Sequence, residues 1–417
     1  MAKIDKNNSS KVLKNVGHLF LAQGINYIFP LLTLPYLTYT LGMNGFGIYA
    51  FVQVIVQYFQ VFTDYGFNLT ATRKLAAAQN NIEEIENIFW SVLVVKIALG
   101  LVATLVGGLL LEFFVTDNQI RWLYIYSFLA VWGSIFFPIW YFQGLESMKQ
   151  IAWINLASKL VGVGFLLAFV RSKEDLALAG LAQAIPLMFS GILACLIIYK
   201  STKISKIKIN IQEIKIELID GRHIFFTSLF SSILSSSGVF FLGLYHNSAI
   251  VGIYASSEKV VKAAVGLFSP ITQAIYPNNA KAFSQSQSEG FRVVRLTGVY
   301  VMLLALFSAL LLWFLAPYIA ILFKWEDERH VYVIQLLAPW LFLGVVNNIF
   351  GVQVLTAMGE SRIYSRLFMF ASVVLLAILI SCVQKYNLHA VLASMSIAEG
   401  VLTILLIFAV NRKWKSR

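Results

Sequence analysis

Long apolar segments alternate with short polar ones along the whole chain. Twelve segments have the length of about 20 residues that a helix needs to cross a hydrocarbon core of roughly 30 Å. The pattern predicts an all-α polytopic membrane protein with twelve transmembrane helices. These spans start near Val16, Ile48, Ile88, Trp122, Ile151, Leu178, Ile224, Ile250, Val293, Val331, Ile363 and Leu388, and each ends about 20 to 26 residues later.

The basic residues are distributed unequally between the two sides of the predicted spans. With the N-terminus inside, the inside segments hold 22 Lys and Arg residues and the outside segments hold six, while four lie within spans. Because cytoplasmic loops retain positive charge, both termini are predicted to be cytoplasmic. The polar segment Met1–Asn15 precedes an apolar run without a small-residue cleavage site, which favours a retained first span over a signal peptide.

Composition leaves little room for a separate soluble domain. Hydrophobic residues make up 59% of the chain and charged residues 12%, so function is expected in or across the bilayer. The net charge of +12 is explained by loops and tails that face anionic lipid. No nucleic acid partner is needed to account for it.

The sequence lacks the motifs of a membrane enzyme. Cys195 and Cys382 both fall inside predicted spans, and the five His residues are scattered. There is no H-E-x-x-H, G-x-x-x-x-G-K or G-x-S-x-G pattern, and the outside loops are short. We therefore expect no catalytic residues, no metal site and no cofactor.

The longest loop, from Lys200 to Gly221, divides the chain into six spans and six spans. This predicts an N-terminal six-helix lobe over residues 1–200, a cytoplasmic linker over 201–221 and a C-terminal six-helix lobe over 222–417. A shift of 205 residues aligns two short segments of the second half with the first half, which suggests a duplication. Parallel halves would be related by an axis along the membrane normal.

Several blocks resemble a known family. Residues 23–27, 30–37 and 41–42, with 65–72, 138–144 and 270–277, resemble the Wzx-type O-antigen flippases of the polysaccharide transporter family, and the likeness covers the chain in order. The resemblance implies a fold similar to multidrug-and-toxin extruders, with two lobes around a central cavity, in the bacterial inner membrane. It implies transfer of an undecaprenyl-diphosphate-linked oligosaccharide between leaflets, with the polysaccharide polymerase and chain-length regulator as candidate partners. Gln23 and Asn26 of the first block are candidate cavity residues.

A line of polar residues follows the second predicted span. The steps between Gln53, Gln57, Gln60, Asp64 and Asn68 are four, three, four and four residues, which places them on one face of a helix. In lipid such a face must contact protein or water. Two interpretations stay open: the side chains line a sugar-transport cavity, or they bond neighbouring helices at about 0.6 kcal/mol each.

Four lysines lie deep in predicted spans, where each costs roughly 3 kcal/mol at the bilayer centre and is therefore a candidate for diphosphate binding. Lys262 follows Glu258 by four residues, so these two are expected to form an ion pair along one helix face. Lys259 and Lys159 are the stronger substrate candidates. Lys96 has only apolar neighbours along its helix, and one alternative is that its side chain reaches to an interface.

Other charged residues carry two interpretations each. Arg73, Lys74 and Arg295 lie where spans meet the cytoplasm, so they either anchor the protein or capture the diphosphate at the loading side, and Arg73 is taken as a cavity candidate. Asp64, Glu258 and Glu399 are the acids within spans and are candidates for coupling transport to an ion gradient. The alternative is that these side chains only bond neighbouring helices.

Three alternatives to a flippase remain at this stage. A multidrug or cation antiporter of the same fold would favour carboxylates and aromatic residues over lysine, because its cargo is cationic. A polysaccharide polymerase or glycosyltransferase would need a large outside loop or an acidic pair near the interface. A lipid scramblase of unrelated fold is the third.

Overall fold

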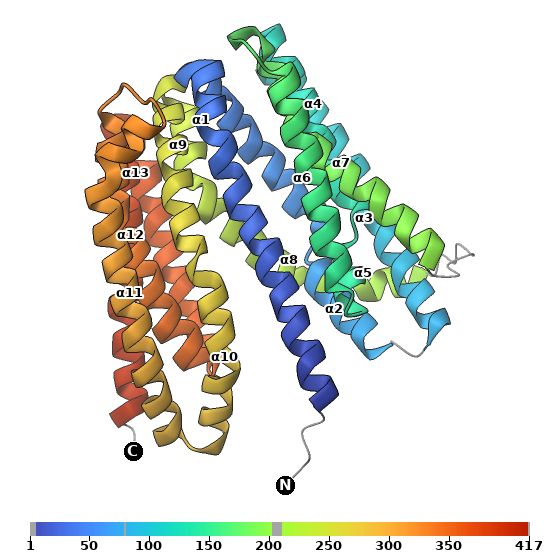
Figure 1. Ribbon diagram of the computed structural model, residues 1–417, viewed down its shortest axis with the longest axis vertical. Coiled ribbons are helices and arrows are strands. Elements are labelled where there is room, and N and C mark those ends of the chain that lie inside the picture. The colour runs from blue at the N-terminus through green and yellow to red at the C-terminus, as the bar shows by residue number, and fades with distance from the viewer. Residues whose placement is uncertain (1–5, 79–80, 202–210, 416–417) are drawn as a thin grey trace. The chain divides into compact units, whose positions relative to one another are not determined.

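The computed structural model describes residues 6–78, 81–201 and 211–415, with side chains for 29–78, 81–200 and 212–414, and every element in these ranges is helical (Figure 1). Nine helices in these ranges are long and apolar enough to span a membrane, which confirms an all-helical polytopic protein. The predicted total of twelve spans stays a prediction. The nine helical segments are Phe29–Ala77, Ile82–Phe114, Asn118–Gly144, Met148–Phe169, Lys173–Lys200, Gln212–Tyr245, Gln287–Leu322, Arg329–Thr356 and Ser361–Trp414.

Two helices each contain two of the predicted spans. Helix α1, Lys6–Asp64, has a non-helical residue at Gly42, and α13, Ser361–Lys415, has one at Asn387. Both residues have positive φ, at 67° and 54°. The chain therefore changes direction inside these helices at the points where the hydropathy pattern places loops.

The described chain divides into two compact units. The first holds the described residues up to Phe29 together with Thr40–Ser236, and the second holds Pro30–Tyr39 together with the described part of Ser237–Arg417. The predicted lobe boundaries at residues 200 and 222 stay a prediction. The first unit contains most of α1, with α2 Phe67–Ala77, α3 Ile82–Phe114, α4 Asn118–Phe136, α5 Ile139–Gly144, α6 Met148–Phe169, α7 Leu176–Ser201 and the first part of α8 Ile211–Tyr245.

Close helix packing in the first unit depends on glycine. A Cβ atom at Gly133 of α4 would lie 2.6 Å from the backbone of Leu187 in α7, and one at Gly180 of α7 would lie 2.8 Å from the carbonyl oxygen of Leu123. Without side chains at these positions, α4 and α7 approach backbone to backbone. This contact fixes α4, which also bonds the polar residues of α1 through Ser127 and the carbonyl of Ala130.

The helix that carries the predicted polar line ends earlier than expected. We expected one helix through Asn68, but α1 ends at Asp64, and Tyr65 and Gly66 take φ values of 47° and 83° before α2 begins. A Cβ at Gly66 would lie 2.7 Å from the side chain of Ile224, so only glycine fits this close approach. The ring of Tyr65 stacks on Phe225 with centroids 4.9 Å apart.

The second unit contains α9 Ser248–Gly266, α10 Phe268–Gln285, α11 Gln287–Leu322, α12 Arg329–Asn348, the π-helix η2 Ile349–Thr356 and α13. We expected a single span from Ile250, but the helix is interrupted at Leu267, between α9 and α10. Neither α9 nor α10 is among the nine spans of the described residues, and α9 carries Glu258, Lys259 and Lys262 within 19 residues.

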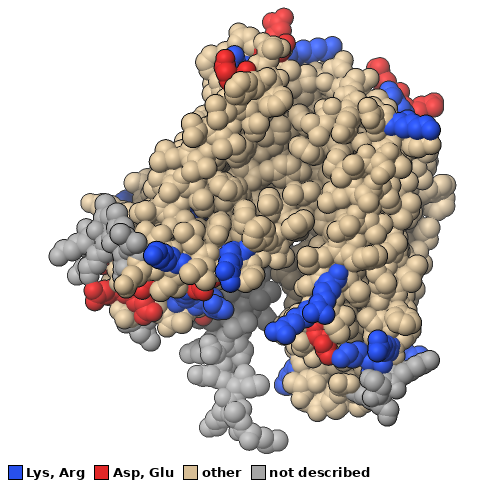
Figure 2. Space-filling view, turned by 180° about the vertical axis from the view of Figure 1, so that it is seen from behind, with Lys and Arg blue, Asp and Glu red and all other residues tan. Residues whose placement is uncertain are grey.

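Charged side chains are grouped on the surface. On the face shown in Figure 2, Lys, Arg, Asp and Glu lie in a few groups, and broad areas between them consist of other residues. This is the distribution expected of a surface that contacts lipid, because charged side chains are costly within the hydrocarbon region.

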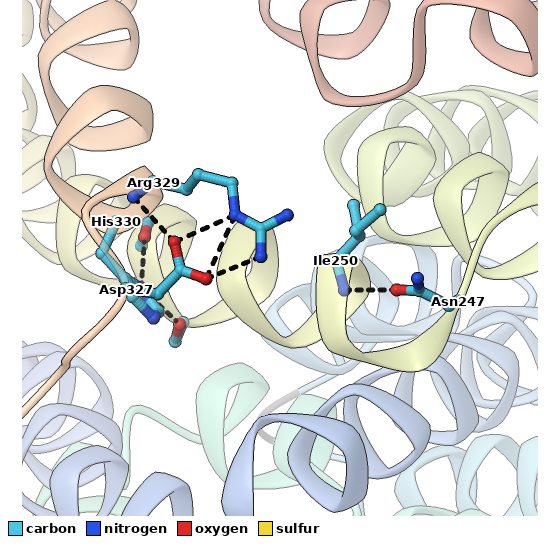
Figure 3. Close-up of polar contacts among 7 residues, drawn as sticks. Asn247, Ile250, Asp327, Arg329 and His330 are labelled. Atoms are coloured by element: carbon cyan, nitrogen blue, oxygen red, sulfur yellow. Dashed lines mark hydrogen bonds and ion pairs between the residues drawn. The ribbon is translucent and has the colours of Figure 1, made fainter.

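The turn between α11 and α12 is held by its own side chains (Figure 3). Arg329 donates hydrogen bonds to both carboxylate oxygens of Asp327, which lowers the pKa of Asp327 below its ordinary value. The buried imidazole of His330 stacks on Trp325 with centroids 4.2 Å apart and lies 3.0 Å from the hydroxyl of Ser257. The indole of Trp325 donates to the hydroxyl of Thr38 at 3.2 Å, which attaches Pro30–Tyr39 to the second unit.

Candidate functional site

The three glutamines of the polar line bond to neighbouring helices of the first unit. The amide of Gln53 donates to the hydroxyl of Ser127 at 3.1 Å, and that of Gln60 donates to the carbonyl of Ala130 at 3.2 Å. Gln57 donates to Ser232 at 3.4 Å and accepts from Ser236 at 3.2 Å. These bonds support the packing interpretation for Gln53 and Gln60, whereas Gln57 keeps an exposed side chain.

Asp64 is the centre of a charged cluster in the first unit. The ammonium of Lys96 lies 3.3 Å from one carboxylate oxygen of Asp64 and 3.5 Å from the carbonyl of Ser134, and Asn68 donates to the other carboxylate oxygen at 3.0 Å. Lys96 is only 2% exposed. The structure contradicts the alternative that Lys96 reaches to an interface, because its ammonium is buried against a carboxylate. The opposite charges of Asp64 and Lys96 thus compensate each other inside the unit.

The other basic candidates of the first unit occupy different surroundings. Lys159 of α6 is partly buried, with its ammonium 5.9 Å from the centroid of the Phe29 ring. Arg73 of α2 is exposed. Its neighbour Lys74, expected to be an anchoring residue, instead pairs with the buried carboxylate of Glu217 at 2.9 Å and with Asp220 at 3.0 Å. Lys74 therefore ties α2 to α8.

In the second unit, the expected ion pair on α9 is present. The ammonium of Lys262 lies 3.0 Å from Glu258, which is 3% exposed and also accepts a hydrogen bond from Tyr254 at 3.0 Å. Lys259 is partly buried on the same helix. The local spacing of four residues was sufficient to predict this pair.

We expect Lys262→Ala to destabilise the protein, because it leaves the buried Glu258 carboxylate without its counterion. A buried polar group that loses its partner costs about 1 to 3 kcal/mol, and more when it is charged. The apparent melting temperature of the detergent-solubilised variant is therefore expected to fall. The double variant Glu258→Gln with Lys262→Met removes both charges and should recover much of the loss. An unchanged melting temperature for Lys262→Ala would count against the pair.

Glu399 lies in the wall of a cavity of about 560 Å³ within the second unit. Its carboxylate accepts a hydrogen bond from the amide of Asn347, whose carbonyl oxygen accepts from Thr403 at 2.8 Å. The carboxylate is therefore oriented by α12 while it borders the cavity. Glu399 is thus a predicted acid that borders a cavity.

The side chains of Gln23 and Asn26 lie outside the described residues. Of the remaining candidates, the structure brings together Asp64, Lys96 and Asn68 in the first unit, and Glu258 and Lys262 in the second. Sequence reasoning missed Glu217, and it missed the polar lining of the cavity beside Glu399. The signal was present in the adjacent amides Asn347 and Asn348, which interrupt an apolar span.

A family model described as polysaccharide biosynthesis protein matches residues 12–287 of the chain. That match covers more than half of the sequence. The chain belongs to the polysaccharide biosynthesis protein family.

Relatives of this polysaccharide biosynthesis protein extend the match over nearly its whole length. It is 30% identical to a putative O-antigen transporter of Escherichia coli strain K12, over 97% of this chain and 98% of the relative. It is 27% identical to a putative O-antigen transporter of Shigella dysenteriae, over 95% of this chain and 100% of the relative. The resemblance noted in the sequence to the O-antigen transporter family is confirmed.

Solved structures show which fold this family member adopts. An inward-facing multidrug resistance MATE family transporter superposes with a TM-score of 0.70 at 14% identity, covering 93% of this chain and 96% of that one. An outward-facing structure of such a transporter gives 0.65 at 13% identity, covering 96% and 95%. The expected MATE-like fold is confirmed. At this identity the likeness establishes the fold alone.

Proposed function

We propose that the protein is a flippase that moves undecaprenyl-diphosphate-linked oligosaccharide repeat units from the cytoplasmic to the periplasmic leaflet of the bacterial inner membrane. The observation that carries the proposal is the near full-length similarity to two proteins named as putative O-antigen transporters. A multi-pass helical protein with at least nine candidate spans has the architecture that such a transfer requires.

The proposed transport cycle is alternating access. It is supported by the MATE-like fold, for which both inward-facing and outward-facing structures are known. We further propose twelve membrane helices in two six-helix lobes over residues 1–200 and 222–417, with both termini cytoplasmic. The 22 to six distribution of basic residues supports this orientation. The polysaccharide polymerase and the chain-length regulator are the proposed partners that receive the product.

We propose that lysines in each unit recognise the diphosphate. Lys159 and Lys259 are partly buried within helices, and a cation in such a setting attracts phosphate more strongly than one in bulk water. Lys96, Lys262 and Arg73 are further candidates: Lys96 and Lys262 pair with carboxylates, and Arg73 is exposed. Gln57 and Asn68 remain candidates for sugar hydroxyls, with Gln53 and Gln60 engaged in packing and Gln23 and Asn26 named on the resemblance alone.

Ion coupling is proposed to use one of the acids within spans. Asp64 and Glu258 each lie 3.0 to 3.3 Å from a lysine ammonium, so protonating either would leave a cation without its counterion. Glu399 instead accepts from the neutral amide of Asn347. Protonation of Glu399 therefore disturbs fewer charges, which makes it the preferred coupling residue.

A multidrug or cation antiporter is the second candidate, because the solved structures with this fold include multidrug transporters. The acids Asp64, Glu258 and Glu399 would serve a cationic cargo. The two named relatives cover almost the whole chain, however, and neither is named as a drug transporter.

The deciding experiment is a clean deletion of the gene in the native host. We expect surface polysaccharide to disappear from gels and lipid-linked single repeat units to accumulate in the membrane fraction, because synthesis continues while transfer stops. Both effects should be reversed by the intact gene on a plasmid. If surface polysaccharide is unchanged and the deletion strain becomes sensitive to cationic drugs, the antiporter replaces the flippase.

A further inference from the structure

The cavity beside Glu399 is built entirely within the second unit. It has a volume of about 560 Å³, inside the range of about 300 to 1,000 Å³ that small-molecule sites occupy. Its walls come from α9, α10, α12, the π-helix η2 and α13, which bring residues between Val265 and Glu399 together. A π-helix is rare and often occurs at functional positions, and here η2 supplies part of the wall.

The lining of this cavity combines aromatic rings with groups that both donate and accept hydrogen bonds. Trp340 and Tyr276 supply the rings, while Gln273, Asn348 and Ser269 supply amides and a hydroxyl. Glu399 is the one carboxylate in the lining, and no lysine or arginine borders the cavity among the described residues. The cavity therefore does not match a diphosphate, which calls for cationic partners.

The wall behind these groups is fixed by buried amide bonds. Gln353 is 1% exposed, accepts from Asn279 at 2.9 Å and donates to the carbonyl of Thr272 at 3.0 Å. These bonds join η2 to α10, and Gln353 and Thr272 both line the cavity. A cavity whose polar wall is already braced loses little conformational entropy when a ligand binds.

We infer that this cavity binds a neutral sugar residue of the transported oligosaccharide, an inference that rests on the proposed function. Sugar rings present apolar C–H faces and hydroxyl groups that donate and accept at once. The indole and phenol rings offer flat apolar surfaces to such a face, and the amides of Gln273 and Asn348 can pair with hydroxyls in both directions. The cavity would thus hold the glycan while lysines elsewhere hold the diphosphate.

A cationic drug is the competing ligand for an aromatic cavity with one carboxylate. A cation offers few hydrogen-bond acceptors to the amides of Gln273 and Asn348, whereas a sugar hydroxyl can both donate to them and accept from them. The carboxylate of Glu399 is also engaged by Asn347. The number of donors in the lining therefore favours a hydroxyl-rich ligand.

Gly344 provides a direct test of the cavity. It lines the cavity, and a Cβ atom placed there would meet no atom within 4 Å, so a large side chain can enter the empty volume without disturbing the backbone. The variant is Gly344→Phe. The matched control is Gly108→Phe, because Gly108 of α3 is also open to a Cβ and lies on an exposed helix face.

The probe is the oligosaccharide released by mild acid from the lipid-linked pool of the deletion strain, radiolabelled and measured by equilibrium dialysis against the full chain in lipid nanodiscs. We expect the wild type and Gly108→Phe to bind, and Gly344→Phe to bind at least tenfold more weakly. Should Gly344→Phe fail to fold, Gln273→Ala with Asn348→Ala replaces it, with the same expected loss.

Three results would overturn the inference. The first is that the wild type does not bind the oligosaccharide. The second is that Gly344→Phe binds it as well as Gly108→Phe does. The third is that the cavity variants still bind the oligosaccharide but lose binding of tetraphenylphosphonium, a cationic drug analogue measured in the same way. The proposed function is tested separately by the deletion strain. If the plasmid-borne wild type restores surface polysaccharide while Gly344→Phe binding is unchanged, the sugar cavity is wrong and the flippase stands.

Discussion

Lys159→Ala and Lys259→Ala are each expected to lower surface polysaccharide at least tenfold while the protein still reaches the membrane. Each change removes a cation that, in the proposed function, binds the phosphates of the carrier lipid. Truncating one partner of a desolvated charge pair typically costs 2 to 5 kcal/mol, and about 1.4 kcal/mol is tenfold in affinity. The measurement is complementation of the deletion strain, with surface polysaccharide quantified on gels against membrane protein level.

Two kinds of control variant distinguish the effect of losing a positive charge from the effect of disturbing the structure. Lys159→Arg and Lys259→Arg keep the positive charge and should retain most of the activity. Lys149→Ala and Lys281→Ala remove exposed lysines from α6 and α10 and should behave as wild type. Full surface polysaccharide in both buried-lysine variants at matched protein levels would exclude them as diphosphate ligands.

Lys96→Ala is expected to give the largest loss of stability. The change leaves Asp64 beside a buried space that held its counterion, and breaking a buried ion pair costs about 3 to 5 kcal/mol. Because the Asp64 side chain is 28% exposed, we expect a value near the lower end of that range. The loss should appear as a lower melting temperature in detergent and as reduced protein in the membrane.

The double variant Lys96→Met with Asp64→Asn separates pair loss from other effects. It removes both charges and keeps a side chain of similar length, so we expect stability close to that of the wild type. If this double variant is as unstable as Lys96→Ala, the ion pair is not the source of the loss. If it is stable but inactive, Asp64 acts in transport beyond its structural role.

Features that depend on nearby residues were predictable from the sequence. The apolar segments gave the helices, because a membrane span must satisfy its own backbone hydrogen bonds. The pair of Glu258 and Lys262 followed from their spacing of four residues on one helix face. These predictions needed only the geometry of a single helix.

Features that join distant residues were not predictable. The ammonium of Lys96 meets Asp64 across 32 residues, and Lys74 meets Glu217 across 143. Since nothing in either helix alone specifies which partner lies opposite, Lys96 was open to a wrong interpretation. The end of α1 at Asp64 was missed for another reason: a non-glycine residue with positive φ, Tyr65, has no clear signal in the sequence.

The cavity beside Glu399 was predictable from the sequence only in part. Glu399 was identified as a functional candidate because an acid within an apolar span is costly. Its surroundings come from five elements, so their convergence required the structure. Aromatic residues such as Trp340 gave no separate signal, because 14% of the chain is aromatic.

The attachment of Pro30–Tyr39 to the second unit has a consequence for biosynthesis. These ten residues are made early, but their partner Trp325 is made 287 residues later. A ribosome that adds about 5 to 20 residues per second needs at least about 15 seconds to cover that distance. During this interval residues 30–39 are already made but the rest of the second unit is not. A chaperone or insertase that protects this nascent segment would therefore promote assembly of the C-terminal half.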